Sequence, residues 1–162
     1  MRILGIDPGL NITGYGVLEG DLNGLELVEA GILRGGASRD LATRLLRLFE
    51  GVQDVLTTFR PDVMAIEDLY SHYERPKTAI LMGHARGVLC LAAAQAGVPL
   101  QHYAATQIKR VLTGNGRAPK SQVQLAVVRQ LQLAEPLDPP DVADALSVAI
   151  CHNYLAGAAK LK

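Results

Sequence analysis

The order of strand-like and helix-like segments is the feature that most constrains the fold of this chain. Three apolar segments, at 2–6, 15–19 and 25–33, fill its beginning and are separated by turns rich in glycine and asparagine. Strands joined so closely pair as antiparallel neighbours. Helical and strand-like patterns alternate after them, and a helix that links two strands allows those strands to run parallel. The sequence therefore predicts an α/β protein whose central mixed sheet is flanked by helices.

The rest of the chain supplies two more strands and five helices. Leucine and valine recur at spacings of three and four between residues 38 and 58, which predicts an amphipathic helix with Ser38 as a candidate N-cap. Strands are expected at 62–66 and 98–103. The other helices are expected at 78–96, 106–112, 120–131 and from about 138 to 156. The sheet is thus five-stranded, and 162 residues that are 49% hydrophobic fit a single domain, 1–162, without a linker.

Four acidic residues lie at positions from which this fold could bring them together. Asp7 and Glu67 each follow a short apolar strand. Asp141 and Asp144 are three residues apart at the start of the last helix, so they share one of its faces. Carboxylates gathered in one pocket repel one another unless a divalent cation such as Mg²⁺ or Mn²⁺ neutralises them. The pattern predicts a catalytic metal centre for phosphodiester hydrolysis, with two ions held by bridging carboxylates.

Local structure offers a competing explanation for two of these acids. Asp7 opens an Asp-Pro-Gly turn, and an Asx-turn is an equally good reason for an aspartate there. Asp141 would be the third residue of the last helix if Asp138 is its N-cap, and an acid there gains roughly 0.3 to 1 kcal/mol from the helix dipole. Capping does not explain Asp144, and glutamate is neither a favoured turn former nor a good strand residue, which favours a functional role for Glu67.

Charge is strongly segregated along the chain, although the net charge is zero. Residues 75–134 contain no acid and eight of the sixteen bases, so this block is +8, and the remainder, with sixteen acids and eight bases, is −8. The eight bases are Arg75, Lys77, Arg86, Lys109, Arg110, Arg117, Lys120 and Arg129. Such a block predicts a positive face for a phosphate backbone beside an acidic centre, with an ordinary solvated surface as the alternative.

Lys120 has a special place within the basic block, because it follows a glycine-rich turn and opens a predicted helix. From there it could stabilise charge on a phosphate in the transition state. A solvated lysine at a helix start is the alternative explanation.

The remaining composition points to an ordinary cytoplasmic protein. Cys90 and Cys151 lie in apolar helical stretches without Cys-x-x-Cys spacing, so we expect two core thiols. No stretch reaches the roughly 20 uninterrupted apolar residues of a membrane span. Residues 1–6 are too short and wrongly flanked for a signal peptide. We therefore expect a soluble protein with no membrane partner.

Beyond these patterns, the chain resembles the RuvC family of Holliday junction resolvases along essentially its whole length. The motifs that carry the resemblance are RILGIDPGLNITGYG at 2–16, AIE at 65–67, GHARG at 83–87, APKSQV at 118–123 and DVADAL at 141–146. The resemblance implies a ribonuclease-H-like fold and a homodimer that nicks two opposed strands of a four-way DNA junction with divalent metal. It also implies cooperation with the branch-migration proteins RuvA and RuvB.

The resemblance assigns roles to individual residues. It implies that the metal carboxylates are Asp7, Glu67, Asp141 and Asp144, that the functional lysines are Lys109 and Lys120, and that Tyr70 stacks on unpaired bases. Some relatives carry histidine at the position of Asp141, and Tyr70 replaces a common phenylalanine. Around them, the basic block supplies further candidates for DNA contact: Arg75, Lys77, Arg110 and Arg117.

The helix expected at 78–96 is apolar around much of its girth and carries several small residues. A helix that is apolar on most faces is expected to be buried on most faces. It could belong to the core of one domain, and the resemblance implies that it also packs on its mate across a two-fold axis.

Three other functions fit parts of the sequence. A related ribonuclease-H-like nuclease could act on RNA or on other branched nucleic acid, since fold does not fix function. A junction-binding module without catalysis is a second alternative, which the four acids disfavour. The third is an ATP-binding phosphotransferase, because Gly14 and Gly16 after the first strand are similar to the phosphate-binding hairpin of the actin and sugar-kinase fold, but 162 residues leave no room for the second lobe.

Overall fold

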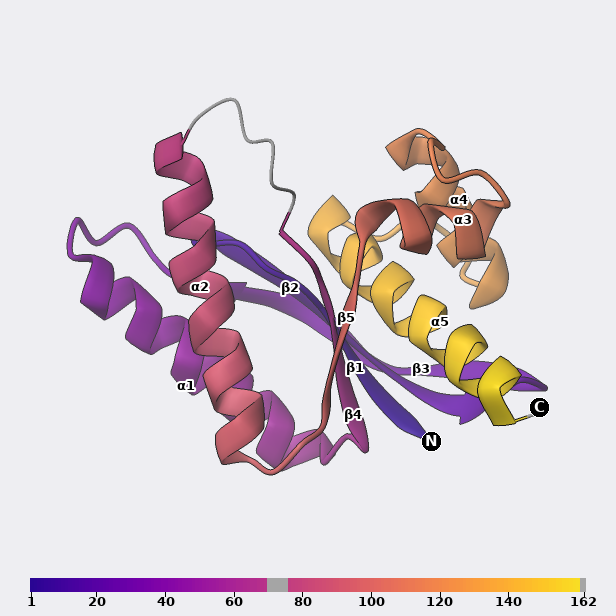
Figure 1. The fold of residues 1–162 in the computed structure, drawn as a ribbon, viewed down its shortest axis with the longest axis horizontal. Helices are drawn as coiled ribbons and strands as arrows, with labels where there is room; N and C mark the ends of the chain where they lie inside the picture. Colours follow the sequence, from indigo (N-terminus) through magenta and orange to yellow (C-terminus); the bar gives the residue numbers. More distant parts are fainter. Residues whose placement is uncertain (70–75, 161–162) are drawn as a thin grey trace.

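The computed structural model describes residues 1–69 and 76–160 of the chain. Its strands and helices follow the predicted order, three strands and then helix, strand, helix, strand and three helices (Figure 1). They are β1 (Arg2–Asp7), β2 (Ile12–Asp21), β3 (Gly24–Arg34), α1 (Leu41–Phe59), β4 (Val63–Glu67), α2 (Pro76–Gln95), β5 (Leu100–Tyr103), α3 (Ala105–Thr113), α4 (Lys120–Gln130) and α5 (Pro140–Lys160).

The strands form one mixed sheet in the order β3-β2-β1-β4-β5. β2 pairs antiparallel with β1 and β3, whereas β4 pairs parallel with β1 and β5. Helices α1 and α2 lie on one face of the sheet, and α3, α4 and α5 lie on the other (Figure 1). The predicted five-stranded mixed sheet flanked by helices is therefore confirmed.

Alternate residues of β1 supply two separate cores. Leu4 and Ile6 pack in the cluster that includes α1 and α2, whereas Ile3 packs in the cluster that includes α5. Successive side chains of a strand point to opposite faces, so Asp7 faces the same side as Ile3. The carboxylate at the end of β1 is thus directed to the side of the sheet that α5 covers.

Glycines in β1 and β2 leave room for α5 to lie directly on the sheet. A Cβ atom at Gly5 would lie 2.1 Å from the carbonyl oxygen of Ala145, and one at Gly14 would lie 2.0 Å from that of Asp141. A Cβ at Gly16 would also collide with the helix. Helix packing accounts for Gly14 and Gly16 without a phosphate-binding hairpin.

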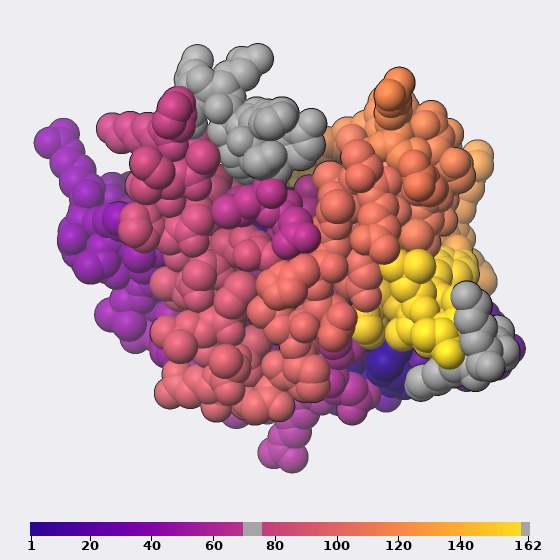
Figure 2. All heavy atoms as spheres, viewed as in Figure 1, coloured from indigo at the N-terminus to yellow at the C-terminus, as the bar shows by residue number. Residues whose placement is uncertain are grey.

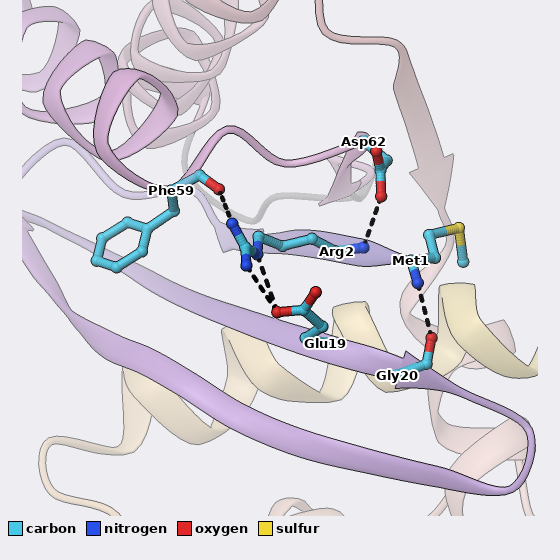
Figure 3. A network of polar contacts seen from close by, with 6 residues as sticks. All are labelled: Met1, Arg2, Glu19, Gly20, Phe59 and Asp62. Carbon is cyan, nitrogen blue, oxygen red and sulfur yellow. Dashed lines mark hydrogen bonds and ion pairs between the residues drawn. The ribbon is translucent and has the colours of Figure 1, made fainter.

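A polar network fixes β1 at the end opposite Asp7 (Figure 3). The Arg2 guanidinium donates to the Glu19 carboxylate, at 2.7 Å from Nη2, and to the Phe59 carbonyl oxygen, at 2.7 Å from Nη1. The backbone N–H of Arg2 donates to the Asp62 carboxylate at 2.7 Å. These bonds tie β1 to β2 and to the connection between α1 and β4.

The predicted N-cap of α1 is wrong. The helix begins at Leu41, and Asp40 caps it by accepting a hydrogen bond from the Thr43 N–H at 2.9 Å. Ser38 lies too far upstream to reach the first turn, and its hydroxyl instead accepts from the Asp40 N–H. The serine therefore shapes the approach to the cap.

The predicted start of α5 is also wrong. The helix begins at Pro140, so Asp138 is not its N-cap and Asp141 is its second residue. The consecutive prolines explain the shift, because a residue that precedes a proline is disfavoured in helical conformation, whereas proline itself is well accommodated as the first helical residue. Asp141 still lies in the first turn, where the helix dipole stabilises a negatively charged side chain.

Helix α2 is less buried than its composition predicts. Its buried residues are Ala85, Leu89, Ala92 and Ala93, whereas Ile80 is 63% exposed and Leu91 is 60% exposed. Figure 2 shows that this helix forms much of one face of the molecule. Within one chain, α2 therefore keeps an apolar face uncovered. Despite this apolar character, no helix among the described residues is long and apolar enough to cross a membrane.

The prediction of core thiols is confirmed for Cys151, whereas Cys90 packs only partly against the core. Cys151 is fully buried, and Cys90 is half-buried against the cluster between the sheet and α2. Burial raises the pKa of Cys151 to about 12, so this thiol stays protonated at neutral pH.

Candidate active site

Asp7 and Glu67 meet at the carboxyl ends of two neighbouring inner strands, β1 and β4. Each is the last residue of its strand, and the two strands pair parallel with Ile6 opposite Ile66. One further step in this register places the two acids side by side. Both point toward the α5 side, because side chains alternate along each strand.

Asp144 approaches the same place from α5 and helps to line a cavity of about 300 Å³. The cavity is lined by Asp7, Glu67, Ala105, Ile108, Lys109, Lys120, Val123, Asp144 and Ser147. It lies between the carboxyl ends of β1 and β4, helix α5 and the two shorter helices α3 and α4. Three of the four predicted acids and both predicted lysines are thus brought together.

Asp141 is the predicted acid that does not line this cavity. It lies three residues before Asp144, and its backbone carbonyl lies over Gly14. Its negative charge still acts on the site, because it contributes to the rise in the pKa of Asp7. Asp141 therefore borders the acidic centre.

The carboxyl groups in the cavity carry strongly perturbed pKa values. Burial, followed by repulsion from Asp144, Glu67 and Asp141, raises the pKa of Asp7 to about 8. Burial and the charge of Asp144 raise the pKa of Glu67, and burial raises that of Asp144. A site that disfavours its own negative charge to this degree is one that a cation would stabilise.

Two lysines offset part of this charge. Lys120 is the first residue of α4, and its Nζ lies 2.5 Å from Oδ2 of Asp144. This hydrogen bond raises the pKa of Lys120, so the ammonium remains charged. Lys109 on α3 also lowers the pKa values of Glu67 and Asp144. Burial outweighs both lysines, because the two acids still have raised pKa values.

The donor set of the cavity fits a hard divalent cation. Asp7, Glu67 and Asp144 offer only oxygen ligands, which suit Mg²⁺ and Mn²⁺. Within residues 1–69 and 76–160, no three acids, histidines or cysteines form a ready-made cluster of ligands. Since Lys120 holds Asp144, the side chains would have to adjust for a cation to be bound there.

Asp68, the acid after Glu67, is engaged elsewhere. Its carboxylate accepts a hydrogen bond from Arg86 Nη2 at 2.8 Å, and the same guanidinium donates through Nε to the Glu67 carbonyl oxygen at 3.2 Å. Arg86 thus holds the end of β4 from the α2 side. Of the two adjacent acids, only Glu67 lines the cavity that Asp7 and Asp144 share.

The predicted DNA-contact residues are spread over several elements. Lys77, Arg110 and Arg117 are exposed on α2, α3 and the connection between α3 and α4. Figure 2 shows the α3–α4 segment as a projection at the upper right, on the opposite side of this view from α2. Tyr70 and Arg75 lie outside the described residues.

The sequence from residue 3 to residue 152 matches the family model for crossover junction endodeoxyribonuclease RuvC. The chain belongs to the RuvC family. This RuvC-family protein is 56% identical over 154 residues to crossover junction endodeoxyribonuclease RuvC of Rhodopirellula baltica, which covers 95% of this chain and 86% of the relative. The match places the predicted acids within the shared region.

Solved structures agree with the family assignment. Thermus thermophilus RuvC in complex with Holliday junction substrate superimposes with a TM-score of 0.92 at 33% identity, covering 98% of this chain and 96% of that one. The yeast mitochondrial Holliday junction resolvase Ydc2 superimposes with a TM-score of 0.64 at 15% identity, covering 98% of this chain and 82% of that one, which shows a shared fold only. The predicted ribonuclease-H-like fold is thereby confirmed for this RuvC-family chain.

Other cavity residues were not predicted from the RuvC-family sequence. The Ser147 hydroxyl donates to the Asp144 carbonyl oxygen at 2.6 Å, and Ile108 and Val123 form apolar walls. Ser147 had one usable signal, since a residue three positions after Asp144 lies on the same helix face. Ile108 and Val123 had no such signal, because hydrophobic residues on short amphipathic helices are ordinarily assigned to the core.

Proposed function

We propose that this protein is a metal-dependent endonuclease that resolves four-way DNA junctions by nicking two symmetric strands as a homodimer. The observation that carries the proposal is the convergence of Asp7, Glu67 and Asp144 in one cavity beside Lys109 and Lys120. The Thermus thermophilus RuvC structure, described as a complex with Holliday junction substrate, supports the choice of substrate.

The acids would serve as metal ligands. Two bound Mg²⁺ or Mn²⁺ ions per subunit would supply an activated water and offset charge on the scissile phosphate. Asp7 and Glu67 would fix that site to the sheet, Asp144 would fix it to α5, and Asp141 would complete it from the preceding helical turn. The raised pKa values of Asp7, Glu67 and Asp144 support this role, since burial and neighbouring acids disfavour their negative charge, which a bound cation would offset.

The lysines would act on the substrate. Lys120 is 60% exposed, so its ammonium can turn from Asp144 toward a phosphate oxygen and stabilise charge that develops in the transition state. Lys109 lines the same cavity and would hold the phosphate backbone near the acids.

The basic block would guide the junction arms. Lys77, Arg110 and Arg117 are exposed and suited to phosphate contact. Arg75 is proposed for the same role, and Tyr70 is proposed to stack on an unpaired base, which uses the face of its ring.

A second copy of the chain would cover α2. Ile80 and Leu91 are exposed on this helix, and a Cβ at Gly87 would meet no other atom within 4 Å, so the backbone there is accessible to close approach. A symmetric pair would present two active sites to two strands of the junction. We further propose one nuclease domain spanning 1–162, action in the cytoplasm and cooperation with RuvA and RuvB.

The test is cleavage of a set of synthetic four-way junctions that differ in sequence at the crossover. Linear duplex and an RNA–DNA hybrid serve as comparison substrates, and the Asp7→Asn variant serves as the blank. With Mg²⁺ or Mn²⁺ present, we expect paired symmetric nicks on junctions alone, and we expect Asp7→Asn to bind junctions without cutting them.

Other outcomes would replace the proposal. Cutting of the hybrid would indicate a broader ribonuclease-H-like nuclease, and junction binding without cutting by the unaltered protein would indicate a recognition module. Loss of binding in Asp7→Asn would give this acid a structural role.

A further inference from the structure

A buried hydrogen bond joins β5 to α5. The Tyr103 hydroxyl lies 2.7 Å from Nδ1 of His152, a residue 49 positions later in the chain. Tyr103 is 8% exposed and His152 is 7% exposed, and their rings meet edge to face with centroids 5.9 Å apart. Neither residue lines the cavity of the acids.

On the sheet side, this bond is connected to Glu67 through the backbone pairing of β5 with β4. Tyr103 is the last residue of β5 and lies opposite Glu67 in the parallel ladder, so both side chains face α5. The Tyr103 carbonyl oxygen also accepts a hydrogen bond from the Asp68 N–H at 2.9 Å. Any movement of the Tyr103 backbone would therefore carry the end of β4 with it.

On the helix side, the bond is attached rigidly to Asp144. His152 follows Asp144 by eight residues on the continuous helix α5, with Val148 midway along the same face. Eight residues correspond to roughly 12 Å of helix rise, a distance over which an α-helix behaves as a stiff rod. The axial position of Asp144 is thus set by the position of His152.

The bond is suited to a fixed geometric role, because both partners stay neutral. Burial raises the pKa of Tyr103 and lowers the pKa of His152, so the phenol keeps its proton and the imidazole does not gain one at neutral pH. A buried, directional bond fixes distance and angle, whereas the surrounding apolar contacts of α5 do not prefer one angle so strongly.

We propose that Tyr103 and His152 are positioning residues whose hydrogen bond sets the separation of Glu67 and Asp144 for cation binding. The inference rests on the proposed function of those two acids. The contact of Gly5 with Ala145 holds α5 against β1, and the Tyr103–His152 bond adds a second attachment on the β4–β5 side.

The test compares Tyr103→Phe with Tyr154→Phe in the full-length protein. Both changes remove only a hydroxyl, and Tyr154 is a partly buried tyrosine of α5 whose hydroxyl makes no hydrogen bond within the described part of the chain. Mn²⁺ alone is titrated into metal-free protein, and free Mn²⁺ is measured by electron paramagnetic resonance. Junction cleavage is measured in parallel as a function of Mn²⁺ concentration.

We expect Tyr103→Phe to weaken Mn²⁺ binding roughly 3- to 10-fold, below the 10- to 100-fold typical of residues that touch a ligand directly. The Mn²⁺ concentration for half-maximal cleavage should rise by the same factor, with most of the rate recovered at saturation. Tyr154→Phe should match the unaltered protein in both measurements.

A second pair of variants tests the partner. His152→Asn places an amide atom near the position of Nδ1 and can keep a hydrogen bond to Tyr103, whereas His152→Leu cannot. Mn²⁺ affinity should therefore fall more in His152→Leu than in His152→Asn.

The possible failures are separable. If the unaltered protein neither binds Mn²⁺ nor cuts junctions, the proposed function fails and this inference fails with it. If the unaltered protein does both, and Tyr103→Phe lowers only the melting temperature with Mn²⁺ affinity unchanged, the bond merely stabilises the fold and the positioning role is overturned.

Discussion

The ammonium of Lys120 lies 2.5 Å from the carboxylate of Asp144, across the mouth between α4 and α5. A basic side chain thus occupies the coordination space of an acid that we propose as a metal ligand. Binding of a cation would release the lysine for use on the substrate, so one residue would screen the empty site and assist the loaded one.

Replacing this lysine should separate catalysis from binding. We expect Lys120→Ala to lower the rate of junction cleavage at saturating Mg²⁺ by roughly 10²- to 10³-fold, because charge on the phosphate loses one donor. Junction affinity, measured by gel shift, should change little. Gln122→Ala, an exposed residue in the same helical turn, is the control and should cleave like the unaltered protein. Equal cleavage by Lys120→Ala would remove Lys120 from the catalytic residues.

The acidic cluster should make the metal-free protein less stable as pH rises. The pKa of Asp7 rises from 3.8 to about 8 on folding, so between these values the folded state holds more protons than the unfolded state. By linkage, this stabilising contribution is complete below about pH 4 and is lost as pH rises toward 8. Asp7→Asn should therefore raise the melting temperature in EDTA at pH 8, by roughly 2–4 °C for each kcal/mol recovered, and much less at pH 4.

Asp54→Asn is the matched control for this measurement, because Asp54 is an exposed acid on α1. Calorimetric scans at several pH values should give it the same dependence on pH as the unaltered protein. A melting temperature of Asp7→Asn that falls below that of the unaltered protein at pH 8 would contradict the raised pKa that burial and neighbouring acids give Asp7.

A charge on the uncovered face of α2 should separate the subunits. Leu91 is 60% exposed in one chain, so Leu91→Glu should leave the fold of each subunit intact while placing a charge in the proposed interface. Light scattering should then report a monomer mass, against a dimer for the unaltered protein. Leu46→Glu is the control, since Leu46 of α1 is 55% exposed, and this variant should remain dimeric. A dimer mass for Leu91→Glu would direct the search for the interface to another surface.

A methyl group between β1 and α5 should be costly. In Gly5→Ala, the new Cβ would lie 2.1 Å from the Ala145 carbonyl oxygen, and relief requires a backbone shift, which typically costs about 1–3 kcal/mol or more. Urea denaturation should show this loss. Gly24→Ala is the control, since its Cβ would meet nothing within 4 Å. Equal stability of the two variants would mean that α5 does not depend on close contact with β1.

The parts of this structure that follow from local chemistry were predictable from sequence. Strand and helix periodicity predicted the order of the elements. The position of Asp7 and Glu67 at the ends of apolar strands marked them as candidate site residues before their strands were known to pair. The start of α5 was mispredicted because two prolines compete for the same boundary. Local patterns also placed Asp141 on the same helix face as Asp144 without revealing that its carbonyl lies over Gly14.

Features that depend on distant partners were beyond local patterns. Tyr103 and His152 are 49 residues apart, and each alone reads as an ordinary residue of a strand or a helix. The burial of α2 was overestimated because apolar composition does not distinguish a face that meets the core of its own chain from one that stays exposed. Charge counting found the basic block, but it could not say that Lys109 and Lys120 enter the cavity while Arg117 stays outside.

The glycine contacts between α5 and the first two strands also limit how the molecule can move. At Gly5 and Gly14 the backbone of α5 lies directly against the strands, so at these two points no side chain separates helix from sheet and absorbs a sliding or tilting motion. β1, β2 and α5 are therefore expected to move together at these contacts. The segment from α3 to α4 packs on α5 through side chains such as Ile108 and Val127, and not backbone against backbone. Accommodation of nucleic acids of differing width would therefore fall to the segment from α3 to α4, which would move relative to β1, β2 and α5.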